Sequence, residues 1–120
     1  MKITIIIPCF NEEKTLSQIV DKVLKFKSFK KEIIIIDDCS EDNTPNIIND
    51  LLLKFDEIKS IRHEKNYGKG AGIKSAVKIS TGDIILIQDA DLEYNPEDYD
   101  NLLEPFIKTD ADVVYGSRFI

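Results

Sequence analysis

Four consecutive isoleucines, Ile33–Ile36, restrict the fold of this chain more than any other feature of its sequence. An uninterrupted β-branched run is typical of a strand whose two faces are both covered in a parallel sheet. We therefore predict a buried strand at 32–37. Other apolar runs predict strands at 3–8, 57–62, 83–88 and 112–115. Apolar residues at helical spacing lie between successive strands, so strand and helix alternate along the chain.

This alternation predicts an α/β fold, in which right-handed crossovers place helices on both faces of a mainly parallel sheet. If the first three strands wind outward in one direction, the fourth returns beside the first. The expected architecture is Rossmann-like and doubly wound, with strand order 3-2-1-4 and one further strand. Ligands in such sheets bind beyond the carboxyl ends of the strands, where the order reverses. Segments 8–12 and 88–91 should therefore lie side by side, with Asp37–Asp38 one strand further along.

Local signals predict where the helices begin. Asn11 is a candidate cap for the first helix, and Thr44 a candidate cap for the second, with Pro45 in its first helical position. A glycine-rich segment at 66–72 lacks the spacing of a Walker or dinucleotide-binding loop. We expect its glycines to let the third helix pack closely on the sheet. A fourth helix is expected to open at 95–97.

Length and charge exclude several classes of protein. The chain has 120 residues, so we expect a single domain. A net charge of -6 argues against nucleic-acid binding, which requires clustered lysine and arginine. No apolar run approaches the roughly 20 residues that span a bilayer, and we expect a cytoplasmic protein.

The two cysteines, Cys9 and Cys39, are too few for a disulfide framework or a zinc site and are interpreted as reduced structural thiols.

Three carboxylates follow the predicted strand at 83–88. Asp89, Asp91 and Glu93 alternate along the chain, and in extended backbone residues two apart point to the same face. Converging carboxylates repel one another, and a bound Mg²⁺ or Mn²⁺ relieves that repulsion while keeping coordination positions for substrate phosphates. The alternative is that these acids are solvated and cap the next helix. The sequence leaves both interpretations open.

Other strand ends carry further candidates. One carboxylate of the Asp37–Asp38 pair is suited to accept a hydrogen bond from a ribose hydroxyl or a base N–H, although acids in loops also bond to nearby backbone. Phe10 offers a flat apolar surface to a base or, alternatively, to the core. Arg118 is suited to offset the charge of a leaving diphosphate. His63, the sole histidine, is assigned no role.

Read together, these segments resemble glycosyltransferase family 2, and in particular its polyprenyl-phosphate branch of dolichyl-phosphate mannose synthases and related glucosyl or aminosugar enzymes. The resemblance covers essentially the whole chain. The segments that carry it are 8–12, 37–44, 66–70, 88–99 and 116–119.

The resemblance implies a GT-A fold that binds a nucleotide diphosphate sugar, such as GDP-mannose or a UDP-sugar. By position, the implied nucleoside contacts are Pro8, Phe10 and Glu12, with Asp37 at the base or ribose. Phe10 stands where the family often has tyrosine, so one hydroxyl contact is absent. Asp89 and Ala90 are implied to border the ribose and diphosphate.

The same resemblance implies a catalytic role for Asp91 as a direct metal ligand and for Arg118 as the arginine facing the diphosphate. Glu93 is implied as a second ligand, where relatives often carry glutamine. The implied reaction is a single inverting displacement by a polyprenyl phosphate at the cytoplasmic face of a membrane. An acceptor phosphate is already ionised at neutral pH, so no catalytic base is assigned.

Family members continue well past the Gly-Ser-Arg-Phe segment at 116–119, whereas this chain stops at Ile120. We therefore expect residues 1–120 to form the nucleotide-sugar-binding part of a truncated domain. A donor-binding fragment without transferase activity is the main alternative. A receiver-type signalling domain is a weaker one, because its acid pair, phosphoryl-accepting aspartate and lysine are not at the required strand ends. A shortened sheet exposes an edge, which favours self-association into a homo-oligomer.

Overall fold

The computed structural model describes residues 2–25, 29–88, 90 and 113–115. It contains a parallel sheet with the strand order β3-β2-β1-β4-β5, so the expected 3-2-1-4 order with a further strand is confirmed. The helix expected from 95–97 lies outside the described residues. The strands are β1 (Lys2–Cys9), β2 (Lys30–Asp37), β3 (Ile58–Arg62), β4 (Ile84–Ile87) and β5 (Val113–Tyr115), and the helices are α1 (Leu16–Lys25), α2 (Thr44–Lys54) and α3 (Lys69–Ile79).

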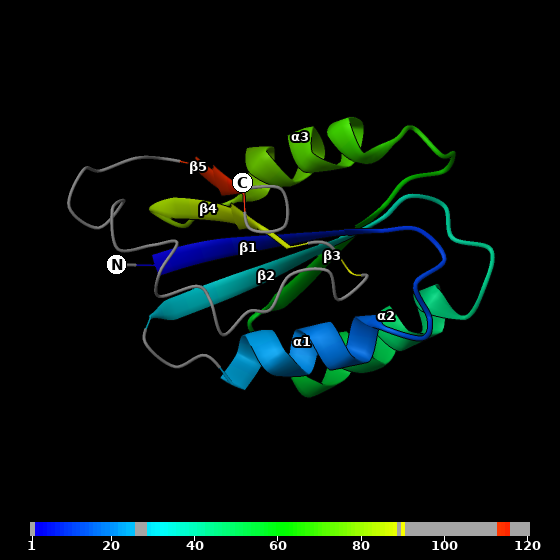
Figure 1. Ribbon diagram of the computed structural model, residues 1–120, viewed down its shortest axis with the longest axis horizontal. Coiled ribbons are helices and arrows are strands. Elements are labelled where there is room, and N and C mark those ends of the chain that lie inside the picture. The colour runs from blue at the N-terminus through cyan, green and yellow to red at the C-terminus, as the bar shows by residue number, and fades with distance from the viewer. Residues whose placement is uncertain (1, 26–28, 89, 91–112, 116–120) are drawn as a thin grey trace.

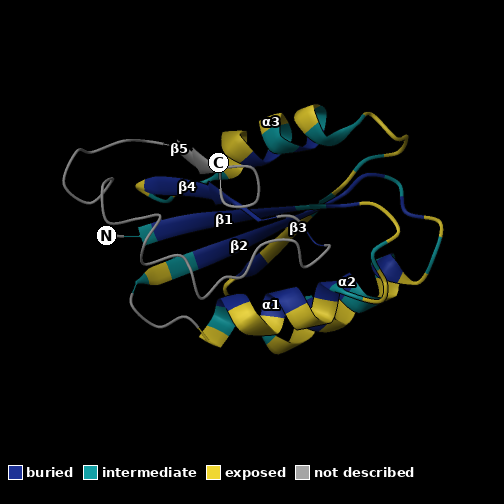
Figure 2. Cartoon of the chain, viewed as in Figure 1, coloured by how far each residue is buried: buried dark blue, intermediate teal, exposed yellow. Residues whose placement is uncertain are grey.

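The described helices cover both faces of the sheet, with α1 and α2 on one face and α3 on the other (Figure 1). The isoleucine run explains how one strand serves both layers. Ile33 and Ile35 belong to the apolar cluster that includes α1 and α2, whereas Ile34 and Ile36 belong to the cluster around α3. The central strands are accordingly buried along most of their length (Figure 2). Burial on both faces explains why β2 has no polar alternation.

A glycine sets the distance between α3 and the sheet. A Cβ atom on Gly72 would lie 2.9 Å from Cγ2 of Ile36, closer than side chains normally approach. The expectation that glycine lets this helix pack closely is therefore confirmed at Gly72. Gly70 has no such constraint, because a Cβ atom there would have nothing within 4 Å of it.

Gly82 lies against the backbone of β1, and this predicts a large loss of stability on substitution. A Cβ atom there would lie 2.5 Å from both the backbone nitrogen and Oγ1 of Thr4. We expect Gly82→Ala to lower the free energy of unfolding by at least about 2 kcal/mol, because the contact is with backbone that has no room to move. Urea denaturation measures this change.

Gly70→Ala is the matched control, since this helical position is open. We expect it to raise the free energy of unfolding by about 0.5 kcal/mol, because alanine favours the helix over glycine. Equal effects of the two substitutions would contradict the packing seen at Gly82.

The amino-terminal end of the sheet is organised around one buried carboxylate, Glu32, whose side chain is 3% exposed. Its oxygens accept hydrogen bonds from Thr81 N at 2.8 Å, Thr81 Oγ1 at 2.6 Å and Thr4 Oγ1 at 3.0 Å. The ammonium groups of Lys2 and Lys59 lie 3.3 and 3.4 Å from Oε2. These donors outweigh the effect of burial, which alone raises a carboxyl pKa, and lower the pKa of Glu32 to about 2. The cluster joins β1 and β2 to the segment before β4.

Both cysteine thiols are free, Cys9 being buried and Cys39 partly buried. Burial, followed by the nearby Asp37 carboxylate, raises the pKa of the Cys9 thiol to about 12. A thiol with that pKa is protonated at neutral pH and is a poor nucleophile. Cys9 instead donates through Sγ to the carbonyl oxygen of Ile36 at 3.3 Å. It therefore has a structural role.

Among the helices that the structure describes, none has the length and apolar character to cross a membrane.

Candidate functional site

The carboxyl ends of β1, β2 and β4 meet at one edge of the sheet. The backbone nitrogen of Asp38 donates to the carbonyl oxygen of Cys9 at 3.0 Å, and that of Gln88 donates to Ile6 at 2.9 Å. The hydroxyl of Thr15 donates to the carbonyl oxygen of Ala90. The loop after β1, the Asp37–Asp38 pair and Ala90 are thus adjacent, as expected from the reversal of strand order between β1 and β4.

The loop after β1 is fastened to the loop after β2 through Asn11. Its backbone has a φ of 54°, and its Oδ1 accepts hydrogen bonds from the amides of Glu41 at 2.8 Å and Asp42 at 3.3 Å. Its own amide donates to Oγ of Ser40 at 2.9 Å. The prediction that Asn11 caps the first helix is therefore wrong. The helix α1 begins only at Leu16, and the Asn11 side chain is used between loops instead.

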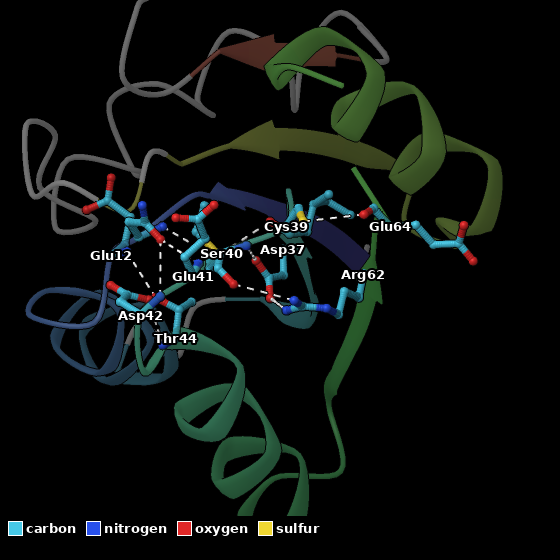
Figure 3. A network of polar contacts seen from close by, with 12 residues as sticks. Glu12, Asp37, Cys39, Ser40, Glu41, Asp42, Thr44, Arg62 and Glu64 are labelled. Atoms are coloured by element: carbon cyan, nitrogen blue, oxygen red, sulfur yellow. Dashed lines mark hydrogen bonds and ion pairs between the residues drawn. The ribbon is translucent and has the colours of Figure 1, made fainter. Parts of the chain in front are cut away.

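A second link between these loops replaces the predicted cap of α2. Thr44 is already helical, and its hydroxyl accepts a hydrogen bond from the amide of Glu12 at 3.0 Å (Figure 3). Asn43 occupies the cap position but makes no side-chain capping bond, so the prediction for Thr44 is wrong. Pro45 lies in the first turn, one residue after the first helical position in which it was expected. The Thr44 hydroxyl holds the loop after β1 by satisfying one of its backbone amides, which needs a partner when it is removed from water.

Asp42 completes this connection between the loops. Its carboxylate accepts from the amide of Thr44 at 2.8 Å and from the amide of Glu13 at 3.2 Å. Burial acts to raise the pKa of Asp42, but hydrogen bonds from Thr44 and Glu13 outweigh it and the pKa is lowered. The two loops are thus held by charged and neutral hydrogen bonds before any ligand arrives.

Asp37 is buried at the end of β2 and is bonded within the protein on both oxygens. Oδ1 accepts from the amide of Ser40 at 2.8 Å, and Oδ2 forms an ion pair with Arg62 at the end of β3 (Figure 3). The local hydrogen bonding that the sequence left open is therefore present. Contact with a base or ribose stays a prediction for Asp37, since each carboxylate oxygen has a second lone pair.

Asp38 makes a different set of contacts, directed toward the segment after β3. It accepts from the amides of Tyr67 at 2.9 Å and Gly68 at 2.8 Å, and lies 3.1 Å from Nδ1 of His63. Burial acts to raise the pKa of Asp38, but the two amides and His63 lower it overall. His63 has no role that the sequence predicts. Its position directly after a predicted strand, at the same sheet edge as Asp38, is the signal from which its role could have been found.

The remaining predicted site residues divide into two groups. Phe10 is 41% exposed at the end of β1, which leaves its ring accessible to a ligand, and Pro8 and Glu12 are partly buried beside it. Ala90 is buried and anchored by Thr15. Four further residues lie outside the described part of the chain, so their predicted roles are untested: Asp89, Asp91, Glu93 and Arg118.

This edge, at the reversal point of a parallel sheet, is typical of a nucleotide-binding α/β protein. The model of the family described as Glycosyl transferase family 2 matches residues 4–120. The chain therefore belongs to glycosyltransferase family 2, as its motifs indicated.

Curated relatives extend this result. The chain is 32% identical over 121 residues to a dolichol-phosphate mannosyltransferase of Pyrococcus furiosus, and the match covers 100% of this chain and 34% of that protein. It is 33% identical to a prophage bactoprenol glucosyl transferase homolog of Escherichia coli K12, and that match covers 98% of this chain and 39% of the relative. The chain thus spans little more than a third of the length of these two relatives.

Solved structures share the fold. Staphylococcus aureus TarS, residues 1–349, superposes with a TM-score of 0.73 at 28% identity, over 90% of this chain and 33% of that one. The mannosyltransferase PcManGT from Pyrobaculum calidifontis, solved with GDP-Man and Mn²⁺, has a TM-score of 0.68 at 25% identity, over 74% of this chain and 27% of that one. These neighbours are GT-A glycosyltransferases, which confirms the expected fold class.

Proposed function

We propose that this chain is the donor-binding part of an inverting, metal-dependent glycosyltransferase that transfers a sugar from a nucleotide diphosphate to a polyprenyl phosphate. The observation that carries the proposal is the adjacency of the loop after β1, the end of β2 and Ala90 at one edge of the sheet. Relatives named for dolichyl-phosphate and bactoprenol sugar transfer support the acceptor class.

The described residues contribute binding and orientation. Phe10 presents an exposed ring against which a nucleobase can pack, while Pro8 and Glu12 border the nucleoside. Asn11, Asp42 and Thr44 fix the loops on either side of it. Loops held in place in advance lose little entropy on binding a donor, which strengthens binding. Asp37 supports the same site by holding Ser40 and Arg62.

The carboxylates of Asp91, Asp89 and Glu93 supply an oxygen-rich donor set, which suits Mg²⁺ or Mn²⁺. Their neighbour Ala90 is anchored at the sheet edge next to α1, where a diphosphate would be expected to lie. When bound, such an ion neutralises charge on the departing nucleoside diphosphate. We assign Arg118 a contact with the same diphosphate, because a guanidinium pairs well with phosphate oxygens. The acceptor phosphate is ionised at neutral pH, so orientation rather than a general base is required.

A nucleotide-binding panel tests this function directly. Isothermal titration with UDP, GDP, UDP-glucose and GDP-mannose, each with and without Mn²⁺, should reveal binding that Mn²⁺ strengthens. A radiolabel transfer assay with the same donors and a short polyprenyl phosphate in detergent then tests turnover. Absence of binding to every nucleotide would contradict the proposal.

A donor-binding fragment without transferase activity is the second candidate. Nucleotide binding without sugar transfer in the assays above would select this candidate.

Association with the cytoplasmic membrane face belongs to the first candidate, because its acceptor is a lipid. The proposed self-association is measured by sedimentation.

A further inference from the structure

One carboxylate fixes the turn at 66–68. The backbone amides of Tyr67 and Gly68 donate to Oδ1 and Oδ2 of Asp38 at 2.9 and 2.8 Å. Gly68 has a φ of 92°, a conformation that side chains other than glycine rarely adopt. Two consecutive amides are therefore held by a single buried acid, in a conformation that favours glycine.

His63 connects the same acid to α3. Its Nδ1 lies 3.1 Å from Oδ1 of Asp38, and its Nε2 lies 3.2 Å from Oγ of Ser75. Because its pKa is lowered, the Asp38 side chain is ionised and can only accept hydrogen bonds. Nδ1 of His63 is therefore the donor in this contact. The rings of His63 and Tyr67 pack edge to face, with centroids 5.3 Å apart and planes at 75°. The backbone of Tyr67 is thus held by Asp38, and its ring is packed against the ring of His63.

Despite these restraints, Tyr67 is 58% exposed. The segment that bears it runs beside the loop after β2, since Sγ of Cys39 donates to the carbonyl oxygen of Glu64 at 3.4 Å (Figure 3). An aromatic side chain is therefore ordered in advance and left accessible at the ligand-binding edge. Such rings bind flat ligands by stacking, with little entropic cost.

We propose that Tyr67 is a nucleotide-binding residue that stacks on the nucleobase, and that Asp38 and His63 are positioning residues that hold it. The proposal rests on the proposed function, because it requires a nucleotide at this edge. Both carboxylates at the end of β2 are engaged by protein donors. Accessible groups around them can pack against the face of a base, and Tyr67 is a large and restrained one among them.

Binding of UDP, GDP and inorganic pyrophosphate to the whole chain, each with Mn²⁺, tests the assignment. We expect Tyr67→Ala to weaken binding of the preferred nucleotide about tenfold, the loss expected for one base–aromatic stack. Pyrophosphate affinity should change less than about twofold, because pyrophosphate has no base. Tyr67→Phe should bind the nucleotide nearly as the wild type does. Leu53→Ala, at a side chain 87% exposed on α2, is the control and should change nothing.

If Asp38 acts by positioning Tyr67, the effects of substituting the two residues on nucleotide binding should not add. Asp38→Asn should weaken nucleotide but not pyrophosphate binding, and adding it to Tyr67→Ala should cause no further loss. Unchanged nucleotide binding in Tyr67→Ala, or an equal loss for pyrophosphate, would overturn this assignment alone. Failure of the wild type to bind either nucleotide would overturn both this assignment and the proposed function.

Discussion

Replacing Asp91 by asparagine should remove most of the metal-dependent gain in nucleotide diphosphate binding. In the wild type we expect Mn²⁺ to raise the affinity for UDP or GDP, and in Asp91→Asn the affinity with Mn²⁺ should be at least about tenfold lower. The reason is that a neutral amide is a much weaker ligand for a hard cation than a carboxylate. Affinity without metal should be similar in the two proteins. Isothermal titration with and without Mn²⁺ measures all four values.

Glu93→Gln is the matched control for this experiment. An amide oxygen remains at that position, and glutamine is often found there in the family that the sequence resembles. We therefore expect a smaller loss than for Asp91→Asn. If Asp91→Asn kept the metal dependence of the wild type, Asp91 would not be the principal ligand, and the proposed metal site would have to be placed elsewhere.

Glu32→Gln is expected to cause a large loss of stability at neutral pH, of about 3 kcal/mol. The pKa of Glu32 lies at about 2 in the folded protein against an ordinary value of 4.5. The ionised carboxylate therefore stabilises the folded state by about 3 kcal/mol more than the protonated carboxyl does. The Glu32 side chain is nearly inaccessible to solvent, but Lys2 and Lys59 are 39% and 48% exposed, so most of this energy comes from the hydrogen bonds of Thr81 and Thr4. Glutamine keeps one acceptor oxygen but loses the charge that faces Lys2, Lys59 and the Thr81 amide.

The pH dependence separates this effect from a loss of packing. Because the folded-state pKa is lowered, the stabilisation by Glu32 is complete above about pH 5 and is lost as the pH falls toward 2. The difference in unfolding free energy between the wild type and Glu32→Gln should shrink across that interval. A difference that stayed constant from about pH 7 to about pH 2 would exclude the electrostatic explanation.

Asp21→Asn provides the control for removal of a carboxylate. Asp21 pairs with Lys25 one helical turn away at 3.0 Å, and both side chains are largely exposed. Exposed pairs of this kind contribute little, so we expect a change below about 0.5 kcal/mol.

The sequence alone was sufficient for the fold, because β-branched runs and helical periodicity report directly on burial. The run Ile33–Ile36 predicted a strand covered on both faces, and the structure places its residues alternately in two apolar clusters. The reversal of strand order followed from the connection rules, so the adjacency of the loop after β1 with Ala90 was also predicted.

Tertiary structure decided how the polar side chains at that edge are used. Asn11 and Thr44 carry the local signature of helix caps, yet their oxygens accept hydrogen bonds from amides that are distant in the sequence. The position of His63 directly after a predicted strand is visible in the sequence, but its partners Asp38 and Ser75 are identified only in the fold. Burial and periodicity are properties of a segment and can be read along the chain. The partner of a hydrogen-bonding group is set by distance in space, and only the folded arrangement provides it.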